Sequence, residues 1–189
     1  MKKIILASTS PRRKEILKKL KIKFTIKKSP YEEDLNLKMS PSDLVKFLSL
    51  GKAQAIKNKD ALVISGDTIV AYNNQVFGKP KTKKKAKEML NILSGKKHEI
   101  ITGITIIDKK TNKTVSFSET TYVYMKKLTP RIIENYIKTK EPLDKAGAYA
   151  LQDLGAILIE KMEGDFFNAA GLPLKRLSEE LKNFGINIL

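Results

Sequence analysis

The sequence predicts an α/β protein with a mixed, partly antiparallel twisted sheet flanked by helices. Short apolar runs with strand character alternate with segments of helical periodicity, which is the pattern of an α/β fold. Two long β-type runs, 99–108 and 114–125, are joined by a turn-like stretch and predict a hairpin, so the sheet cannot be purely parallel. The chain shows neither an internal repeat nor a linker-like stretch. At 189 residues it is expected to form a single domain over residues 1–189.

The first half of the chain is expected to alternate strands and helices. Ser40-Pro41-Ser42-Asp43 is a typical helix start, with Ser40 as N-cap, and Gly95 stands where a glycine often follows a helix. Residues 61–65 form a short apolar run between turn signals, which indicates a buried strand ending in Gly66-Asp67-Thr68. The expected strands are 4–7, 24–28, 61–65, 69–72 and 75–77, and the expected helices are 12–20, 41–58 and 82–94.

The second half contains the hairpin and a loop of unusual composition. Thr129-Pro130 starts a helix that should end near Thr139. Residues 141–154 are rich in Gly, Ala and Tyr and are expected to form a loop. The remaining expected elements are a strand at 156–162, a polar-aromatic turn at 164–171 and a closing helix at 173–184.

The composition limits the chemistry and raises a question about charge. The formal net charge is +17, but the lysines are spread along the whole chain and are not interleaved with aromatic residues. Such a pattern favours a solvated surface over a nucleic-acid-binding stripe, although basic proteins attract polyanions. The absence of cysteine excludes disulfides and thiolate metal sites. No apolar run is long enough to span a bilayer, and no signal peptide is recognisable, so a cytoplasmic protein is expected.

The turn Ser8-Thr9-Ser10-Pro11-Arg12-Arg13 is the first candidate for function. It connects an apolar strand to a helix start, where unpaired N–H groups and a partial positive charge favour phosphate. The hydroxyl groups and two arginines add donors suited to phosphate oxygens. The alternative is a capped strand-to-helix turn whose arginines lie in solvent.

Catalysis must use carboxylates, lysines, arginines and hydroxyls, because His98 is the only histidine and is expected to be structural. These residue types suit phosphoryl chemistry with a hard divalent cation. Asp67 is the best base, because ligands gather at strand ends in open α/β sheets; alternatively it caps a turn. Lys52 and Lys79 lie beside glycines, and the chain has no Walker-type loop.

With these pieces in place, the sequence resembles the Maf family of nucleoside triphosphate pyrophosphatases nearly from end to end. The resemblance is carried by short motifs in a fixed order, which are Leu6-Ala7-Ser8-Thr9-Ser10-Pro11-Arg12-Arg13, Glu32-Glu33, Lys52-Ala53, Gly66-Asp67-Thr68, Gly78-Lys79-Pro80, Leu93-Ser94-Gly95, Glu141-Pro142-Leu143-Asp144-Lys145-Ala146-Gly147-Ala148-Tyr149, Gln152 and Gly171-Leu172-Pro173-Leu174. It implies a cleft between two lobes, as in the ITPase-like architecture, and a possible homodimer.

The resemblance implies hydrolysis between the α and β phosphates of a nucleoside triphosphate with Mg²⁺ or Mn²⁺. Asp67 then activates water and, with Glu32 and less certainly Glu33, handles the cation. The expected substrate-binding residues are Ser8, Arg12, Arg13, Lys52, Thr68, Lys79 and Gln152. Of the two arginines, Arg12 is expected to face the phosphates.

The Asp67-Thr68 pair and the loop with Gln152 are similar to the family branch that acts on dTTP and UTP. An amide offers a donor and an acceptor that match the O4 and N3–H edge of a pyrimidine. Gly66, Gly51 and Asp153 depart from the usual family pattern, so a branch preferring 7-methyl-GTP remains an alternative. The rival from another class is a non-catalytic, basic nucleic-acid-binding or division-regulating protein. No specific nucleic acid and no membrane are expected as partners.

Overall fold

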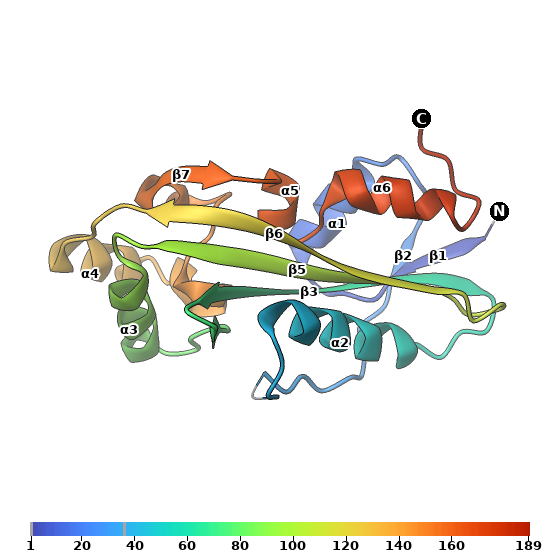
Figure 1. Ribbon diagram of the computed structural model, residues 1–189, viewed down its shortest axis with the longest axis horizontal. Coiled ribbons are helices and arrows are strands. Elements are labelled where there is room, and N and C mark those ends of the chain that lie inside the picture. Colours follow the sequence, from blue (N-terminus) through green and yellow to red (C-terminus); the bar gives the residue numbers. More distant parts are fainter. Residues whose placement is uncertain (1, 36) are drawn as a thin grey trace. The chain divides into compact units, whose positions relative to one another are not determined.

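The computed structural model, which describes residues 2–35 and 37–189, contains a seven-stranded mixed sheet (Figure 1). The strand order is β2-β1-β3-β5-β6-β7, and β4 pairs with β3. Strand β1 runs parallel to β2 and β3, whereas β4 and β7 run antiparallel to β3 and β6. The predicted mixed sheet is confirmed. The strands are β1 (Lys3–Leu6), β2 (Thr25–Ile26), β3 (Ala61–Tyr72), β4 (Gln75–Phe77), β5 (Lys97–Asp108), β6 (Thr114–Met125) and β7 (Ile159–Glu163).

Most helices begin at the polar residues that the sequence indicates. The hydroxyl of Ser40 accepts a hydrogen bond from the backbone N–H of Asp43 (3.2 Å), and Thr129 caps its helix in the same way. Gly95 follows α3 with φ +68°. The helices are α1 (Pro11–Lys18), α2 (Pro41–Gln54), α3 (Lys83–Leu93), α4 (Pro130–Lys138), α5 (Phe166–Ala169) and α6 (Leu174–Lys182), with short 3₁₀ turns η1 (Glu141–Asp144), η2 (Ala146–Ala148) and η3 (Leu154–Leu158).

The chain divides into two compact units that share the long strands. Unit 1 comprises Met1–Asp67, Thr102–Glu119 and Gly171–Leu189, and unit 2 comprises Thr68–Ile101 and Thr120–Ala170. The boundary on β3 falls between Asp67 and Thr68. The single domain expected from the sequence stays a prediction.

In unit 1, helix α2 covers one face of the sheet, and α1 and α6 cover the other (Figure 1). Helix α2 approaches β5 so closely at Gly103 that a β-carbon there would overlap the carbonyl group of Val45. Glycine is therefore required at this crossing. The contact fixes the height of α2 above the sheet.

In unit 2, the core lies between the sheet and the helices α3 and α4. It includes Leu90, Ile100, Val123 and Ile137. His98 is 2% exposed and its Nε2 lies 2.6 Å from the hydroxyl oxygen of Tyr149. The hydrogen bond and the burial agree with the structural role that the sequence suggests for this histidine.

Several predicted boundaries are wrong. Residues 61–65 and 69–72 form one continuous strand, so Asp67 lies inside β3 and not at its end. The extended backbone continues because β3 is also a neighbour of β5 and because β4 pairs with Val70–Tyr72, beyond the point where β1 stops. Helix α2 ends at Gln54 and not near Asn58.

Shorter elements also differ from the prediction. Strand β2 has only two residues, 25–26, and β7 begins at Ile159 because 154–158 form a 3₁₀ turn. Within the predicted turn 164–171, the side chain of Asp165 accepts from the N–H of Phe167 and starts the one-turn helix α5. Local capping overrides the sequence pattern at that point.

Candidate functional site

Asp67 lies just beyond the point where β1 leaves β3. The parallel pairing ends at Leu6 and Ile64, followed by a hydrogen bond from the Ala7 N–H to the Ile64 carbonyl (2.7 Å). The chain after β1 then turns into α1. Asp67 is therefore interior to its own strand but lies at the carboxyl end of the parallel pair, where ligands gather in such sheets.

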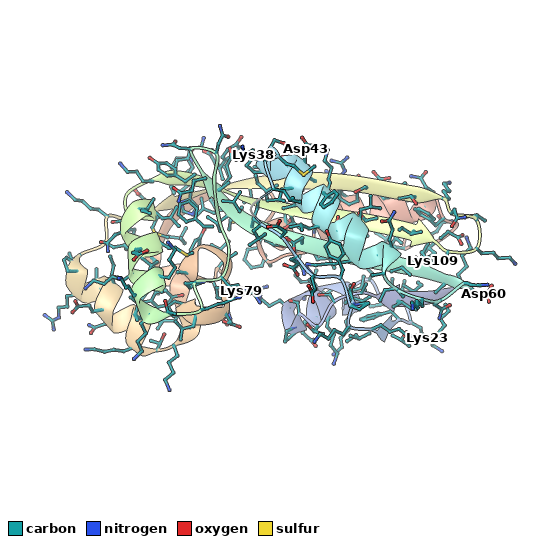
Figure 2. The ribbon with its side chains drawn as sticks, turned by 90° about the horizontal axis from the view of Figure 1, so that it is seen from below. Lys23, Lys38, Asp43, Asp60, Lys79 and Lys109 are labelled. Atoms are coloured by element: carbon teal, nitrogen blue, oxygen red, sulfur yellow. The ribbon has the colours of Figure 1, made fainter. Side chains whose placement is uncertain are left out.

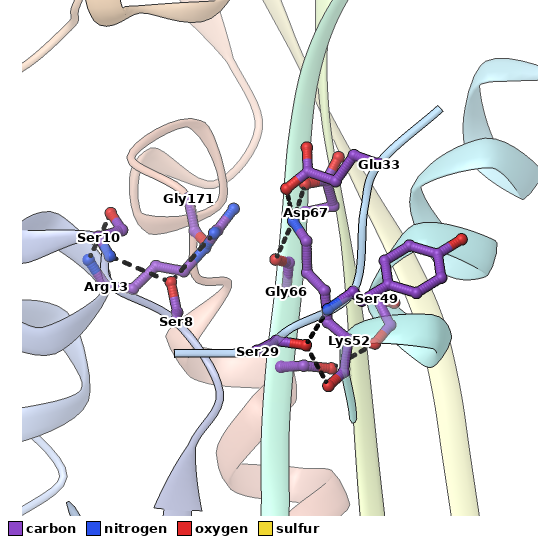
Figure 3. A network of polar contacts seen from close by, with 12 residues as sticks. Ser8, Ser10, Arg13, Ser29, Glu33, Ser49, Lys52, Gly66, Asp67 and Gly171 are labelled. Atoms are coloured by element: carbon purple, nitrogen blue, oxygen red, sulfur yellow. Dashed lines mark hydrogen bonds and ion pairs between the residues drawn. The ribbon is translucent and has the colours of Figure 1, made fainter. Parts of the chain in front are cut away.

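Helix α2 brings Lys52 to Asp67. The inward face of this helix is apolar at Val45 and Leu48 and becomes polar at Ser49 and Lys52, which follow at helical spacing. Both polar residues are buried. The Lys52 ammonium makes an ion pair with Asp67 Oδ1 (Figure 3).

A chain of hydroxyl groups fixes α2 against the sheet. The Ser49 and Thr105 hydroxyls lie 2.8 Å apart, and Thr105 lies 2.9 Å from the hydroxyl of Ser116. The Ser65 hydroxyl donates to the Ser49 carbonyl at 2.6 Å. Because these contacts join α2 to β3, β5 and β6, they hold the backbone at Lys52 at a fixed distance from β3, while the four-carbon side chain keeps its own rotamer freedom. The roles of Ser49 and Thr105 could not be predicted from the sequence, because single hydroxyl residues in apolar runs form no recognisable motif.

The loop before α2 brings a second carboxylate to Lys52. Glu33 Oε1 lies 2.7 Å from Lys52 Nζ. The Ser29 hydroxyl donates to the Lys52 carbonyl (2.9 Å) and accepts from the Tyr31 N–H (3.2 Å), which ties the loop to α2. Glu32 makes no hydrogen bond or ion pair with any residue in 2–35 or 37–189. The structure therefore places Glu33, and not Glu32, beside Asp67.

Gly51 allows this loop to lie close to α2. A β-carbon on Gly51 would overlap the ring of Tyr31. The departure from the family pattern at residue 51 thus has a local explanation, because the aromatic ring occupies the space that a side chain would take. At Gly66, another departure, a β-carbon would lie 2.8 Å from Ile104 Cδ1 and 3.3 Å from Arg13 Nε.

The turn between β1 and α1 holds Arg13 in place. The Ser10 side chain caps α1 by accepting from the Arg13 N–H, and the Ser8 hydroxyl accepts from the Ser10 N–H (3.2 Å). The Arg13 guanidinium donates through Nε to the Gly171 carbonyl (2.8 Å) and through Nη1 to the Ser8 hydroxyl (3.4 Å) (Figure 3). Arg13 is therefore engaged with its own chain. Within the described residues, the side chain of Arg12 makes no hydrogen bond or ion pair.

Burial dominates the electrostatics of Asp67. Its side chain is 8% exposed, and burial raises the pKa of the carboxyl above its usual value. The charges of Lys52 and Arg13 offset part of this rise in pKa, and Glu33 adds to it. Burial also lowers the pKa of the Arg13 guanidinium, while the Asp67 charge raises it. A buried carboxylate of this kind is a stronger base than an exposed one.

In unit 2, the segment 141–149 supports the turn that carries Lys79. The Gly147 N–H donates to the Gly78 carbonyl (3.2 Å), and the Lys81 N–H donates to the Leu143 carbonyl (3.3 Å). Lys79, which is labelled in Figure 2, is exposed between these contacts.

Glu141 supports the loop that carries Gln152. Its carboxylate accepts from the Tyr136 hydroxyl (2.7 Å) and from the N–H groups of Leu154 (3.1 Å) and Gly155 (2.9 Å). Gln152 is exposed on this loop, and Thr68 is half-buried on β3. From the sequence, Glu141 is recognisable only as part of a motif, and its position after a helix gives no signal for this role.

The carboxylates around Lys52 are the candidate metal ligands in the described ranges, 2–35 and 37–189. No group of three or more His, Cys, Asp or Glu side chains in these ranges could hold a metal ion. Asp67 and Glu33 both contact one ammonium group, so their oxygens are close enough to share one cation. Two carboxylates with phosphate oxygens are a usual ligand set for Mg²⁺.

The sequence comparisons identify the family. The Maf family model, described as Maf-like protein, matches residues 3–184. The chain belongs to the Maf family. Its relatives include a dTTP/UTP pyrophosphatase of Bacillus cereus (strain G9842), 49% identical over 100% of this chain and 98% of the relative, and one of Bacillus anthracis (strain CDC 684 / NRRL 3495), 48% identical with the same coverage.

A search of solved structures gives a partial likeness. The Staphylococcus aureus Ham1 protein matches 66% of this chain and 72% of its own, with a TM-score of 0.47 and 14% identity. This likeness is too weak to establish a shared fold. In the described residues, none of the helices is both long and apolar enough for a membrane span.

Proposed function

We propose that this Maf-family chain hydrolyses the bond between the α and β phosphates of dTTP and UTP, releasing the nucleoside monophosphate and pyrophosphate. The observation that carries the proposal is the buried Asp67 carboxylate, paired with Lys52 and lying where β1 turns into the arginine-bearing helix α1. The names of the relatives at 48–49% identity support the same reaction and the same two substrates.

Asp67 acts as the general base. Its carboxylate takes a proton from a water molecule, whose oxygen attacks the α-phosphorus. The bond from that phosphorus to the bridging oxygen breaks, and pyrophosphate leaves with the electron pair. Burial of Asp67 supports this role because a raised pKa brings a carboxyl closer to the pH at which bases work best.

The start of α1 and several positively charged side chains hold the triphosphate. The Arg12 N–H in the first turn of α1 and the Ser8 hydroxyl supply donors, and the Arg12 side chain supplies a charge that pairs with no acidic group among the residues that the structure describes. Arg13 is assigned to holding the turn in shape, because Gly171 and Ser8 accept its hydrogen bonds. Lys79 supplies a further positive charge to phosphate.

A divalent cation fits the donor set of Asp67 and Glu33. When bound, Mg²⁺ or Mn²⁺ neutralises phosphate charge and favours departure of pyrophosphate. Glu33 is preferred to Glu32 as the second protein ligand because Glu33 makes an ion pair with Lys52, whereas Glu32 makes none with any described residue. Gln152 is proposed to read the O4 and N3–H edge of the pyrimidine, with Thr68 beside Asp67 as a further contact.

The dispersed lysines do not favour the nucleic-acid-binding alternative. Lys23, Lys38, Lys79 and Lys109 come from four separate segments of the chain (Figure 2). Specific nucleic-acid binding usually requires basic groups gathered along one element or face. The net charge is therefore assigned to the solvated surface.

The direct test is pyrophosphate release from dTTP, UTP and 7-methyl-GTP with Mg²⁺ or Mn²⁺. We expect release from dTTP and UTP, and a loss of at least a hundredfold in Asp67→Asn, since the amide cannot accept the proton. The control is Asp60→Asn, which removes the same charge from an exposed position. Near wild-type rates in Asp67→Asn would contradict the mechanism, and a preference for 7-methyl-GTP would contradict the substrate assignment.

A pH profile gives a second test of the base. Because the pKa of Asp67 is raised, kcat/KM should fall on the acid side at a pH above the value of about 4 that is typical of aspartate. A flat profile from pH 8 to pH 4 would contradict the assignment of Asp67.

A further inference from the structure

The Lys52 ammonium lies inside a tripod of oxygen atoms. It makes an ion pair with Asp67 Oδ1, lies 2.7 Å from Glu33 Oε1, and lies 3.5 Å from the Gly66 carbonyl oxygen. An ammonium group has three N–H donors. All three are therefore directed to protein oxygens in this structure, and none is left for a phosphate.

The same oxygens are those that a divalent cation would use. Two carboxylates and a backbone carbonyl are hard oxygen ligands of the kind that Mg²⁺ and Mn²⁺ prefer. The Asp67 and Lys52 side chains are 8% and 11% exposed, so the position between the carboxylates has little room for a second cation while the ammonium is there. Glu33 is 44% exposed and gives the position its open side.

We propose that Lys52 occupies the cation position in the nucleotide-free protein and gives it up when a triphosphate binds. This inference rests on the proposed function and adds to it the order in which the triphosphate and the cation bind. A buried ammonium that leaves two carboxylates needs a new anionic partner, because an unpaired buried charge is strongly destabilising. The triphosphate supplies that partner, so Lys52 moves to phosphate oxygens as Asp67 and Glu33 become free for the cation.

Two consequences distinguish this arrangement from a preformed metal site. The nucleotide-free protein should bind divalent cations weakly, although its two carboxylates are in place. Removing the Lys52 ammonium should make cation binding without nucleotide tighter. In a site where Lys52 only contacts phosphate, the same change would leave cation binding without nucleotide unaltered.

The test is a Mn²⁺ titration of the nucleotide-free protein, followed by the electron paramagnetic resonance signal of free Mn²⁺. We expect Lys52→Met to bind Mn²⁺ at least tenfold more tightly than the wild type. Lys46→Met is the matched control, since it removes the same charge from the exposed face of the same helix, where Lys46 pairs with Asp43 at 2.9 Å. Its affinity should stay within twofold of the wild type. The titration is done at pH 8, because loss of Lys52 raises the pKa of Asp67 further.

A second pair of variants covers misfolding and locates the site. Lys52→Gln replaces the ammonium by a neutral polar group and should show the same gain if Lys52→Met does not fold. Adding Glu33→Gln to either variant should abolish the gain. Equal or weaker Mn²⁺ binding in the folded Lys52 variants would overturn the inference. Because no nucleotide is present, this result is independent of pyrophosphate release by the wild type, which tests the proposed function.

Discussion

The two adjacent arginines should have separable effects on stability and activity. Arg13 Nε donates a 2.8 Å hydrogen bond to the buried Gly171 carbonyl, whereas Arg12 makes no hydrogen bond or ion pair within 2–35 and 37–189. Arg13→Met keeps most of the apolar stem but removes this charged donor. Hydrogen bonds that involve a charged group contribute about 1.5–3 kcal/mol, and an unpaired buried carbonyl adds a penalty. We therefore expect a loss of about 2–3 kcal/mol in the free energy of unfolding.

Arg12→Met should behave in the opposite way. A change at a partly exposed side chain that has no hydrogen-bond or ion-pair partner among the described residues is expected to alter stability by no more than about 0.5 kcal/mol. If Arg12 binds phosphate in the transition state, its removal should lower kcat/KM for dTTP by about 10²–10³, as for other single donors to a developing anion.

Urea unfolding followed by circular dichroism, with pyrophosphate release from dTTP, measures both effects. With a slope of about 2 kcal/mol/M, the urea midpoint of Arg13→Met should fall by roughly 1 M. At temperatures where Arg13→Met stays folded, its activity should exceed that of Arg12→Met. An Arg13→Met variant as stable as the wild type, or an unstable Arg12→Met variant with full activity, would refute these separate roles.

Three further predictions concern the scaffold. Burial lowers the pKa of His98 to about 4, from a usual value of about 6.5. The free energy of unfolding should therefore decrease as the pH falls below about 6.5, by about 2 kcal/mol between pH 7 and pH 5. Urea titrations of His98→Gln should show a smaller decrease. Gly103→Ala should cost about 3 kcal/mol of unfolding free energy and lower the melting temperature, because its β-carbon overlaps the backbone of Val45; an unchanged melting temperature would contradict this. Glu141→Gln should raise KM for dTTP about tenfold with little change in kcat, since one acceptor of the loop around Gln152 is lost; equal KM values would contradict it.

Most elements of the fold could be predicted from the sequence because their signals are local. Hydrophobic periodicity and polar caps such as Ser40 are properties of a few neighbouring residues. The continuity of β3 could not be predicted in this way. Gly66 and Asp67 disfavour strands, and their extended backbone depends on pairing with distant segments.

The candidate site could be predicted as a set of residues but not as an arrangement. The sequence indicates Asp67, Lys52 and an acidic pair on the preceding loop. The structure then distinguishes Glu33 from Glu32, because the loop geometry set by Ser29 decides which of two adjacent acids reaches Lys52. Adjacent residues in a loop have no fixed period, so spacing gives no basis for that choice.

The contact between Gly51 and Tyr31 has a consequence for how such sequences can change. A side chain at 51 and an aromatic ring at 31 exclude each other in this geometry. A relative with an acidic or amide residue at the position of Gly51 should therefore carry a smaller residue at the position of Tyr31, or a differently placed loop. These two residues, twenty positions apart, are therefore expected to change together. A substitution at only one of them would displace the carboxylate of Glu33, two residues after the ring.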